Sequence, residues 1–265
     1  MRTIFALFLL ITSMSFGQED WKLIAKYELK EQSVWQSDLM GNLYIADKDL
    51  LVKYDTAGVK QFSQSIKSKG RIDAILPINT MKILLFSSQQ QTFTIFDNTL
   101  SEANKTYDLS SMNFGYVTHL AVSNQPNKVW IYDQLNSKLV LLDLGRSNQQ
   151  QEVENVRGLL NSTEIEWVKE DGNQLYLFDG AEKLYVFDLY GSLLNIIELP
   201  DTEGLEINEK EIFVIKKGEV YRWRSEDKTF ESVKAPVSDI LEFQWVNTTF
   251  FFRSKNELSK FRLYF

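Results

Sequence analysis

The 265-residue chain contains no cysteine, a single histidine and only four prolines. Without cysteine the chain can form no disulfide, no Cys-based zinc or thiol site, and no lipoprotein-type export signal. The single histidine, His119, cannot build the multi-histidine metal sites found in many hydrolases. No apolar run approaches the roughly 20 residues that a membrane-spanning helix needs. These absences exclude disulfide-linked folds and metal sites built from cysteines or from several histidines.

The chain also lacks an excess of positive charge. Its formal net charge is -7, and its lysines and arginines are scattered along the sequence. Affinity for nucleic acid depends on neutralising phosphates with clustered basic residues, so we expect no nucleic-acid partner. The 44% hydrophobic and 13% aromatic content instead indicates a globular protein with a large core.

The N-terminus has the pattern of a Sec-type signal peptide. Arg2 supplies the positive charge, residues 4–11 the apolar segment, and residues 15–17 (Ser-Phe-Gly) a small-x-small cleavage site. We expect residues 1–17 to be removed, which leaves residues 18–265 as a single domain with a charge of -8, because only Arg2 is lost. The predicted location is periplasmic or secreted, with no transmembrane segment in the mature chain.

A five-residue apolar pattern recurs six times along the chain. Its copies read LYIAD, ILLFS, VWIYD, LYLFD, IFVIK and FFFRS, and they begin at residues 43, 83, 129, 175, 212 and 250. The spacing of 37 to 46 residues is typical of the blades of a propeller. Further β-prone segments before and after each copy bring the count to four strands per repeat. Each repeat therefore corresponds to one blade.

The apolar residues of these strands occupy successive positions, not alternating ones. In the copy at 175, Leu175 and Leu177 point to one face of the sheet while Tyr176 and Phe178 point to the other. Both faces must therefore be buried, as they are when blades pack face to face. The exposed outer strands are expected to mix polar with apolar residues.

The last repeat ends after its third strand, whereas residues 21–29 (WKLIAKYEL) form a strand with no partner in their own repeat. Pairing the two would close the ring and remove an open sheet edge. We predict an all-β protein, a six-bladed β-propeller with four-stranded antiparallel blades, in which residues 21–29 complete the last blade.

Two segments resemble NHL-type repeats. Residues 38–58 (DLMGNLYIADKDLLVKYDTAG) place Gly-Asn before the strand, Ala-Asp after it, and an aromatic residue, Asp and Gly at the close; residues 171–194 are similar. The resemblance implies a six-bladed propeller of a family whose members serve as protein-binding platforms, sugar-lactone hydrolases, lyases or ligand sensors. The specific motifs cover two of the six blades, and no catalytic residue is carried over to this chain.

Polar residues gather where the innermost strands are expected to begin, at one mouth of the central channel. They are Asp73, Thr118, Glu164, Glu203 and Asp239, with His119 next to Thr118. A ring of carboxylates attracts a cation or a basic partner, and oxygen ligands suit calcium or magnesium. The alternative is a solvated rim. For His119, packing in the channel is the alternative to a general base.

The loops on the same face carry residues that often anchor protein interfaces. Lys69 and Arg71 lie in the second blade, and Phe114 and Tyr116 lie in the third. The alternative for Phe114 is that its ring packs back onto its own blade. By contrast, the recurrent Asp55, Asp97, Asp143 and Asp188 follow strand ends, where an aspartate stabilises turns.

These observations favour a non-enzymatic propeller exported to the envelope of a Gram-negative bacterium, where it acts as a protein-interaction or scaffold module. The sequence has a full set of strand residues and no assembled catalytic group. One alternative is a hydrolase resembling sugar lactonases, with calcium or magnesium held by the acidic ring as its only cofactor. The other is a binder of glycans or small ligands that stack on Trp35, Tyr116 or Trp245.

Overall fold

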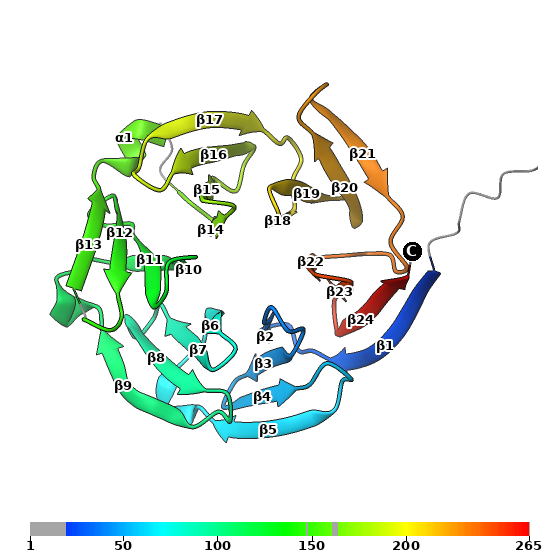
Figure 1. Ribbon diagram of the computed structural model, residues 1–265, viewed down its shortest axis with the longest axis horizontal. Helices are drawn as coiled ribbons and strands as arrows, with labels where there is room; N and C mark the ends of the chain where they lie inside the picture. The colour runs from blue at the N-terminus through cyan, green and yellow to red at the C-terminus, as the bar shows by residue number, and fades with distance from the viewer. Residues whose placement is uncertain (1–19, 147, 161–163, 265) are drawn as a thin grey trace, which may run out of the picture.

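The computed structural model describes residues 20–146, 148–160 and 164–264, which form six four-stranded antiparallel sheets arranged in a ring (Figure 1). This confirms the prediction of an all-β, six-bladed propeller. The expected signal peptide, residues 1–17, lies outside the described residues. Within them, no helix is long and apolar enough to cross a membrane.

Consecutive strands build each blade from the channel outward. The first three blades contain β2 (Val34–Ser37), β3 (Leu43–Asp47), β4 (Leu50–Tyr54) and β5 (Lys60–Ser65); β6 (Ala74–Asn79), β7 (Lys82–Ser87), β8 (Thr92–Asp97) and β9 (Glu102–Asp108); and β10 (Val117–Val122), β11 (Lys128–Asp133), β12 (Lys138–Asp143) and β13 (Asn148–Val153). The next two contain β14 (Trp167–Asp171), β15 (Gln174–Phe178), β16 (Lys183–Asp188) and β17 (Leu193–Glu198); and β18 (Gly204–Asn208), β19 (Glu211–Lys216), β20 (Glu219–Arg224) and β21 (Thr229–Val233). A short helix, α1 (Val156–Leu160), connects the third blade to the fourth, and single turns of 3₁₀ helix occupy Lys67–Lys69 and Ser110–Met112.

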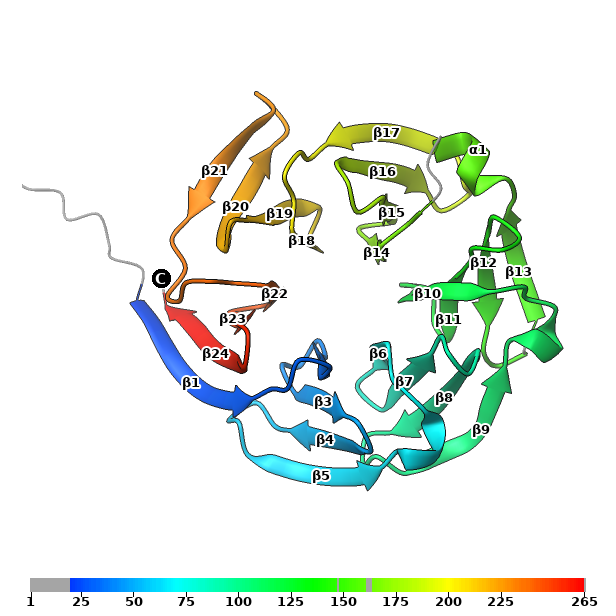
Figure 2. The ribbon, with the colours of Figure 1, turned by 180° about the vertical axis from the view of Figure 1, so that it is seen from behind.

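The sixth blade joins the two ends of the chain. It contains β22 (Glu242–Val246), β23 (Thr249–Arg253), β24 (Glu257–Tyr264) and, outermost, β1 (Asp20–Glu28). Figure 2 shows β1 running along the outside of β24, with which it pairs in antiparallel register. The prediction that the N-terminal strand completes the last blade is confirmed.

Lys260 of β24 ties this closing blade to the first one. Its Nζ donates to the carbonyl oxygens of Gly41, at 2.9 Å, and Thr56, at 2.8 Å, in two turns of the first blade. It also lies 5.3 Å from the centre of the Phe251 ring. The side chain is only 1% exposed, and this burial lowers the pKa of its amino group to about 8.

The core consists of apolar layers between neighbouring blades. Leu175 and Leu177 of β15 belong to the layer shared with the third blade. Tyr176 and Phe178 of the same strand belong to the layer shared with the fifth. Both faces of the strand are therefore buried, as the run of successive apolar residues predicts.

Two innermost strands begin later than the sequence pattern suggests. β14 begins at Trp167 and β22 at Glu242, each three residues after the start of the β-prone run. Ile165 and Ile240, which contribute to those runs, lie in the connecting segments and fill the layers beside them. An apolar residue that anchors a linker thus has the same sequence signal as one in a strand.

The recurrent aspartates stabilise turns. The side chains of Asp55, Asp97 and Asp188 each accept hydrogen bonds from the backbone amides two and four residues further along the chain. The side chain of Asp143 accepts hydrogen bonds from the backbone amides of Gly145 and Arg146. Their structural role is as predicted.

Candidate functional site

The innermost strands all begin at one face of the ring, which we call the top face. The turns between the second and third strands of the blades lie at the same face, because adjacent strands are antiparallel. The predicted channel-mouth residues and Tyr116 therefore lie on or close to one surface.

The strand register shows which residues occupy the same position in different blades. The amides of Asp73, Glu166, Glu203 and Leu241 each donate to a carbonyl oxygen at the end of the second strand of their blade, at 2.8 to 2.9 Å. Asp73 and Glu203 thus occupy the expected position. In the fourth and sixth blades the equivalents are Glu166 and Leu241.

The expected acidic ring is therefore incorrect at two of its positions. Glu164 and Asp239 each lie two residues before the equivalent site, in exposed linkers. The buried isoleucines described above lengthen these linkers and displace the acids. Among the described residues, no group of three or more histidine, aspartate or glutamate side chains is placed to hold a metal ion.

The remaining acids have partners close by. The Asp73 carboxylate accepts hydrogen bonds from the amide and hydroxyl of Ser88, at 2.7 and 2.6 Å, and pairs with Arg71 at 3.3 Å. Glu203 accepts from the amide of Gly218 at 3.4 Å. These bonds orient the carboxylates along the blades.

His119 connects the third blade to the fourth. Its Nδ1 lies 3.0 Å from the hydroxyl of Thr118, and its ring also bonds to the backbone of Glu166. Burial lowers the pKa of the imidazole, although the Glu166 backbone and the charge of Asp73 act in the opposite direction. The neutral ring is therefore favoured, in a bridging position between blades.

Acidification is expected to destabilise the protein through His119. The unfolded imidazole has its ordinary pKa of 6.5 and the folded one a lower value, so the unfolded state binds more protons between the two. The stabilisation present above pH 6.5 is lost as the pH falls through the folded pKa. Thermal unfolding should show a steeper fall in Tm below pH 6.5 for the native protein than for His119→Gln. Equal slopes would contradict this role.

The two basic residues predicted to bind a partner differ in their availability. Lys69 donates to Glu102 at 2.8 Å and to Thr106 at 3.2 Å, so it is held against the outer strand of its blade. Arg71 is exposed and lines a hollow of about 170 Å³ between the first and second blades, together with Gln32. Of the pair, Arg71 is the residue that presents its charge to solvent.

The two aromatic residues predicted to bind a partner, Phe114 and Tyr116, also differ in their exposure. Phe114 is 5% exposed and fills the layer between the second and third blades, so its ring is not available to a partner. This agrees with the packed alternative for Phe114. Tyr116 is 45% exposed on the top face.

A buried carboxylate fixes the backbone at Tyr116. Asp133 is 0% exposed and accepts hydrogen bonds from the amides of Gly115 and Tyr116, at 2.8 and 3.1 Å. It also accepts from the amide and the side chain of Asn136, at 3.1 and 2.8 Å. Burial alone would raise the pKa of Asp133, but these bonds together hold it below its ordinary value. Asp133 thereby fastens two loops of the third blade to each other.

The second of these loops presents Leu135, which is 66% exposed. Its side chain lies over Gly115, where an added Cβ would come within 2.9 Å of the Leu135 Cδ2 atom. We call Tyr116 and Leu135 the top-face anchor. Asp133 and Leu135 were not predicted from the sequence, although the aspartate that closes the strand VWIYD was visible in the repeat.

The other two predicted stacking residues are not available in the same way. Trp35 is buried, and its Nε1 donates to Glu242 at 2.6 Å. Trp245 stacks on Phe250, with ring centres 5.5 Å apart. Tyr116 is the member of the set with an exposed ring.

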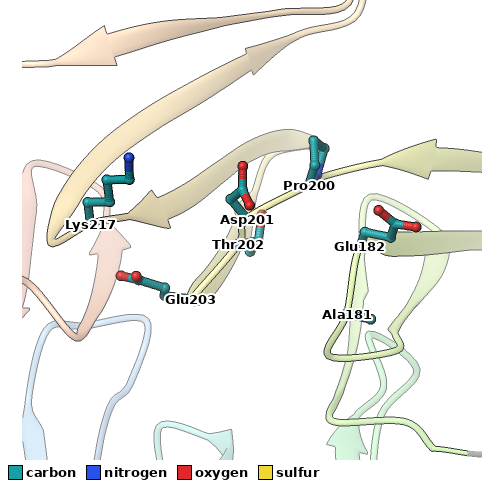
Figure 3. Close-up of a pocket in the computed structure, with 7 residues that line it drawn as sticks. All are labelled: Ala181, Glu182, Pro200, Asp201, Thr202, Glu203 and Lys217. Atoms are coloured by element: carbon teal, nitrogen blue, oxygen red, sulfur yellow. The ribbon is translucent and has the colours of Figure 1, made fainter.

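The larger hollow on the top face has a volume of about 510 Å³ and lies between the fourth and fifth blades (Figure 3). It is lined by Ala181, Glu182, Pro200, Asp201, Thr202, Glu203 and Lys217. Three carboxylates and an ammonium group dominate its surface, whereas small-molecule sites are mostly apolar with a few polar groups. Its composition does not favour a site for an apolar small molecule.

Solved structures that resemble this chain are propellers of varied function. The similarity to virginiamycin B lyase from Staphylococcus aureus has a TM-score of 0.62 at 9% identity, and covers 92% of this chain and 100% of that one. A streptogramin B lyase has a TM-score of 0.58 at 12% identity, and the similarity covers 87% of this chain and 78% of that one. The WD40 domain of Pan2 from Neurospora crassa has a TM-score of 0.59 at 9% identity, with 89% of this chain and 79% of that one covered. What they share is the fold.

Comparison with protein-family models finds no match, and neither does comparison with curated proteins. The propeller is thus established, whereas membership of the NHL-type family is not confirmed.

Proposed function

We propose that the protein is an exported, non-enzymatic propeller that holds a protein partner on its top face, in the periplasm or outside the cell. The observation that carries this proposal is the top-face anchor. Tyr116 and Leu135 expose their side chains on two adjacent loops, and buried Asp133 holds both loops. Aromatic and apolar residues that are rigid before binding lose little conformational entropy on association.

The surroundings of the anchor suit a protein more than a small molecule. The hollow between the fourth and fifth blades is lined largely by charged and polar groups, and Arg71 and Glu203 extend the surface to either side of the channel. A polar rim around an apolar centre is the usual anatomy of a protein interface. Given the acidic surface of this chain, a partner with basic residues around an apolar centre is the best match.

The test is co-purification of a tagged, exported protein after crosslinking in cells. We expect a stoichiometric envelope partner, which is lost or reduced at least tenfold in the double variant Tyr116→Ala, Leu135→Asp. The matched control is Leu39→Asp, an exposed leucine in the turn at the opposite end of an innermost strand. Recovery of the native protein alone, or equal loss in the control, would overturn the proposal.

A further inference from the structure

The outermost strand of the fourth blade differs from the other outer strands. Each blade ends in a strand with one unpaired edge at the circumference of the ring (Figure 1). Soluble proteins usually protect such edges with charges or with very short strands. In β17, with the sequence LLNIIE, four of the six residues are aliphatic and only Glu198 is charged.

The apolar side chains of β17 are exposed. Leu193, Leu194 and Ile196 are 38%, 52% and 46% exposed, and Tyr190 in the preceding turn is more exposed still. In the described parts of the other outer strands, at most one large hydrophobic residue per strand is exposed, as with Phe62 of β5. The fourth blade therefore concentrates exposed apolar surface on a sheet edge.

The backbone of this edge is also open. One residue beyond the paired ends of β16 and β17, the amide of Leu199 donates to the carbonyl oxygen of Glu182 at 2.6 Å, which makes these two a hydrogen-bonded pair in the same register. Because such pairs alternate along antiparallel strands, the amides of Ile196 and Glu198 point away from β16. The Ile196 amide is instead capped by the side chain of the adjacent Asn195, at 2.9 Å. A side-chain cap of this kind is replaceable by a strand.

We propose that β17 pairs with β17 of a second copy of this chain, antiparallel and with Ile196 opposite Ile196. This register lets the outward amide of each Ile196 donate to the other copy. It also gathers Leu194 and Ile196 of both chains on one face of a sheet that continues across the two blades.

Symmetry favours a second copy as the occupant, and the charges on β17 do not oppose it. An antiparallel pair about a two-fold axis needs only one surface, since the same strand serves both sides. In the proposed register the two Glu198 residues lie four strand positions apart, which is about 13 Å. That distance exceeds the Debye length of about 8 Å at physiological ionic strength, so their repulsion is largely screened.

The absence of native cysteine gives a direct test. In an Ile196→Cys variant, mild oxidation should link two chains, because the Cα atoms of a hydrogen-bonded antiparallel pair lie about 5.5 Å apart, within disulfide range. Phe62→Cys, on the outer strand β5, is the matched control and should stay unlinked. Equal linkage of both variants, or none at Ile196→Cys, would overturn the proposal.

Light scattering of the unmodified protein provides the second measurement. We expect a concentration-dependent species of twice the chain mass, and at least a tenfold weaker dimer for Ile196→Lys than for Phe62→Lys. A native protein that stays monomeric at its highest soluble concentration would contradict the pairing of β17 with a second copy of the chain. The exposed edge would then have to bind a different partner. The result is independent of the top-face anchor, which lies in the third blade.

Discussion

Replacing Asp133 by alanine is expected to lower the free energy of unfolding by about 3 kcal/mol or more. The carboxylate is fully buried and accepts four hydrogen bonds, so its removal leaves a polar cavity and four donors in two loops without their partner. Urea denaturation followed by tryptophan fluorescence measures the change. The same variant should weaken binding of the proposed top-face partner, because the backbone at Tyr116 is no longer fixed.

The matched control is Asp143→Ala, in the same blade. Asp143 also accepts two backbone amides, but it lies in an exposed turn where water can replace the carboxylate. We expect a much smaller loss of stability. Equal losses in the two variants would show that burial of the Asp133 carboxylate contributes little.

Raising the pH from about 7.5 to 9.5 should stabilise the native protein relative to Lys260→Met, by about 1–2 kcal/mol. The buried Lys260 amino group has a pKa of about 8, whereas the unfolded chain keeps the ordinary value of 10.5. Between these values the folded protein loses a proton that the unfolded chain retains. The free energy of unfolding therefore rises with pH in this window.

The measurement is chemical denaturation of both proteins at several pH values. The upper limit matters, because burial raises the pKa of Tyr27 and of Tyr176 to about 12. Above pH 10 their unfolded counterparts ionise first and the stability falls again. A native protein whose stability follows that of Lys260→Met throughout the window would contradict a buried, charged Lys260.

The fold could be predicted from the sequence because blade strands carry a strong and repeated signal. Runs such as LYLFD are apolar on both faces, and the distance between copies leaves room for four strands. The unpaired segment at residues 21–29 indicated the closure of the ring. Strand boundaries were less accurate where Ile165 and Ile240 anchor linkers, because burial in a linker and burial in a strand select the same residue type.

The candidate site was only partly visible. Arg71, Phe114 and Tyr116 were candidates for a partner surface, with packing onto the blade as the alternative for Phe114. Arg71 and Tyr116 are exposed and Phe114 is buried, and sequence alone does not show which way an aromatic ring points. Leu135 was missed because an exposed leucine is common and carries no motif. The residues expected at the channel mouth were misassigned in two blades, because Glu164 and Asp239 lie two residues before the equivalent position. Glu166 supplies a carboxylate there in the fourth blade, whereas Leu241 replaces it in the sixth.

The pairing of β1 with β24 also sets a condition on synthesis of the chain. β1 emerges from the ribosome first, yet its partner is complete only when residue 264 has been made. Until then β1 has no native neighbour to pair with, whether the chain folds during synthesis or after export. A transcript that is truncated before β24 therefore yields a chain that cannot close, and such a product should be recognisable to proteases by that one unpaired strand.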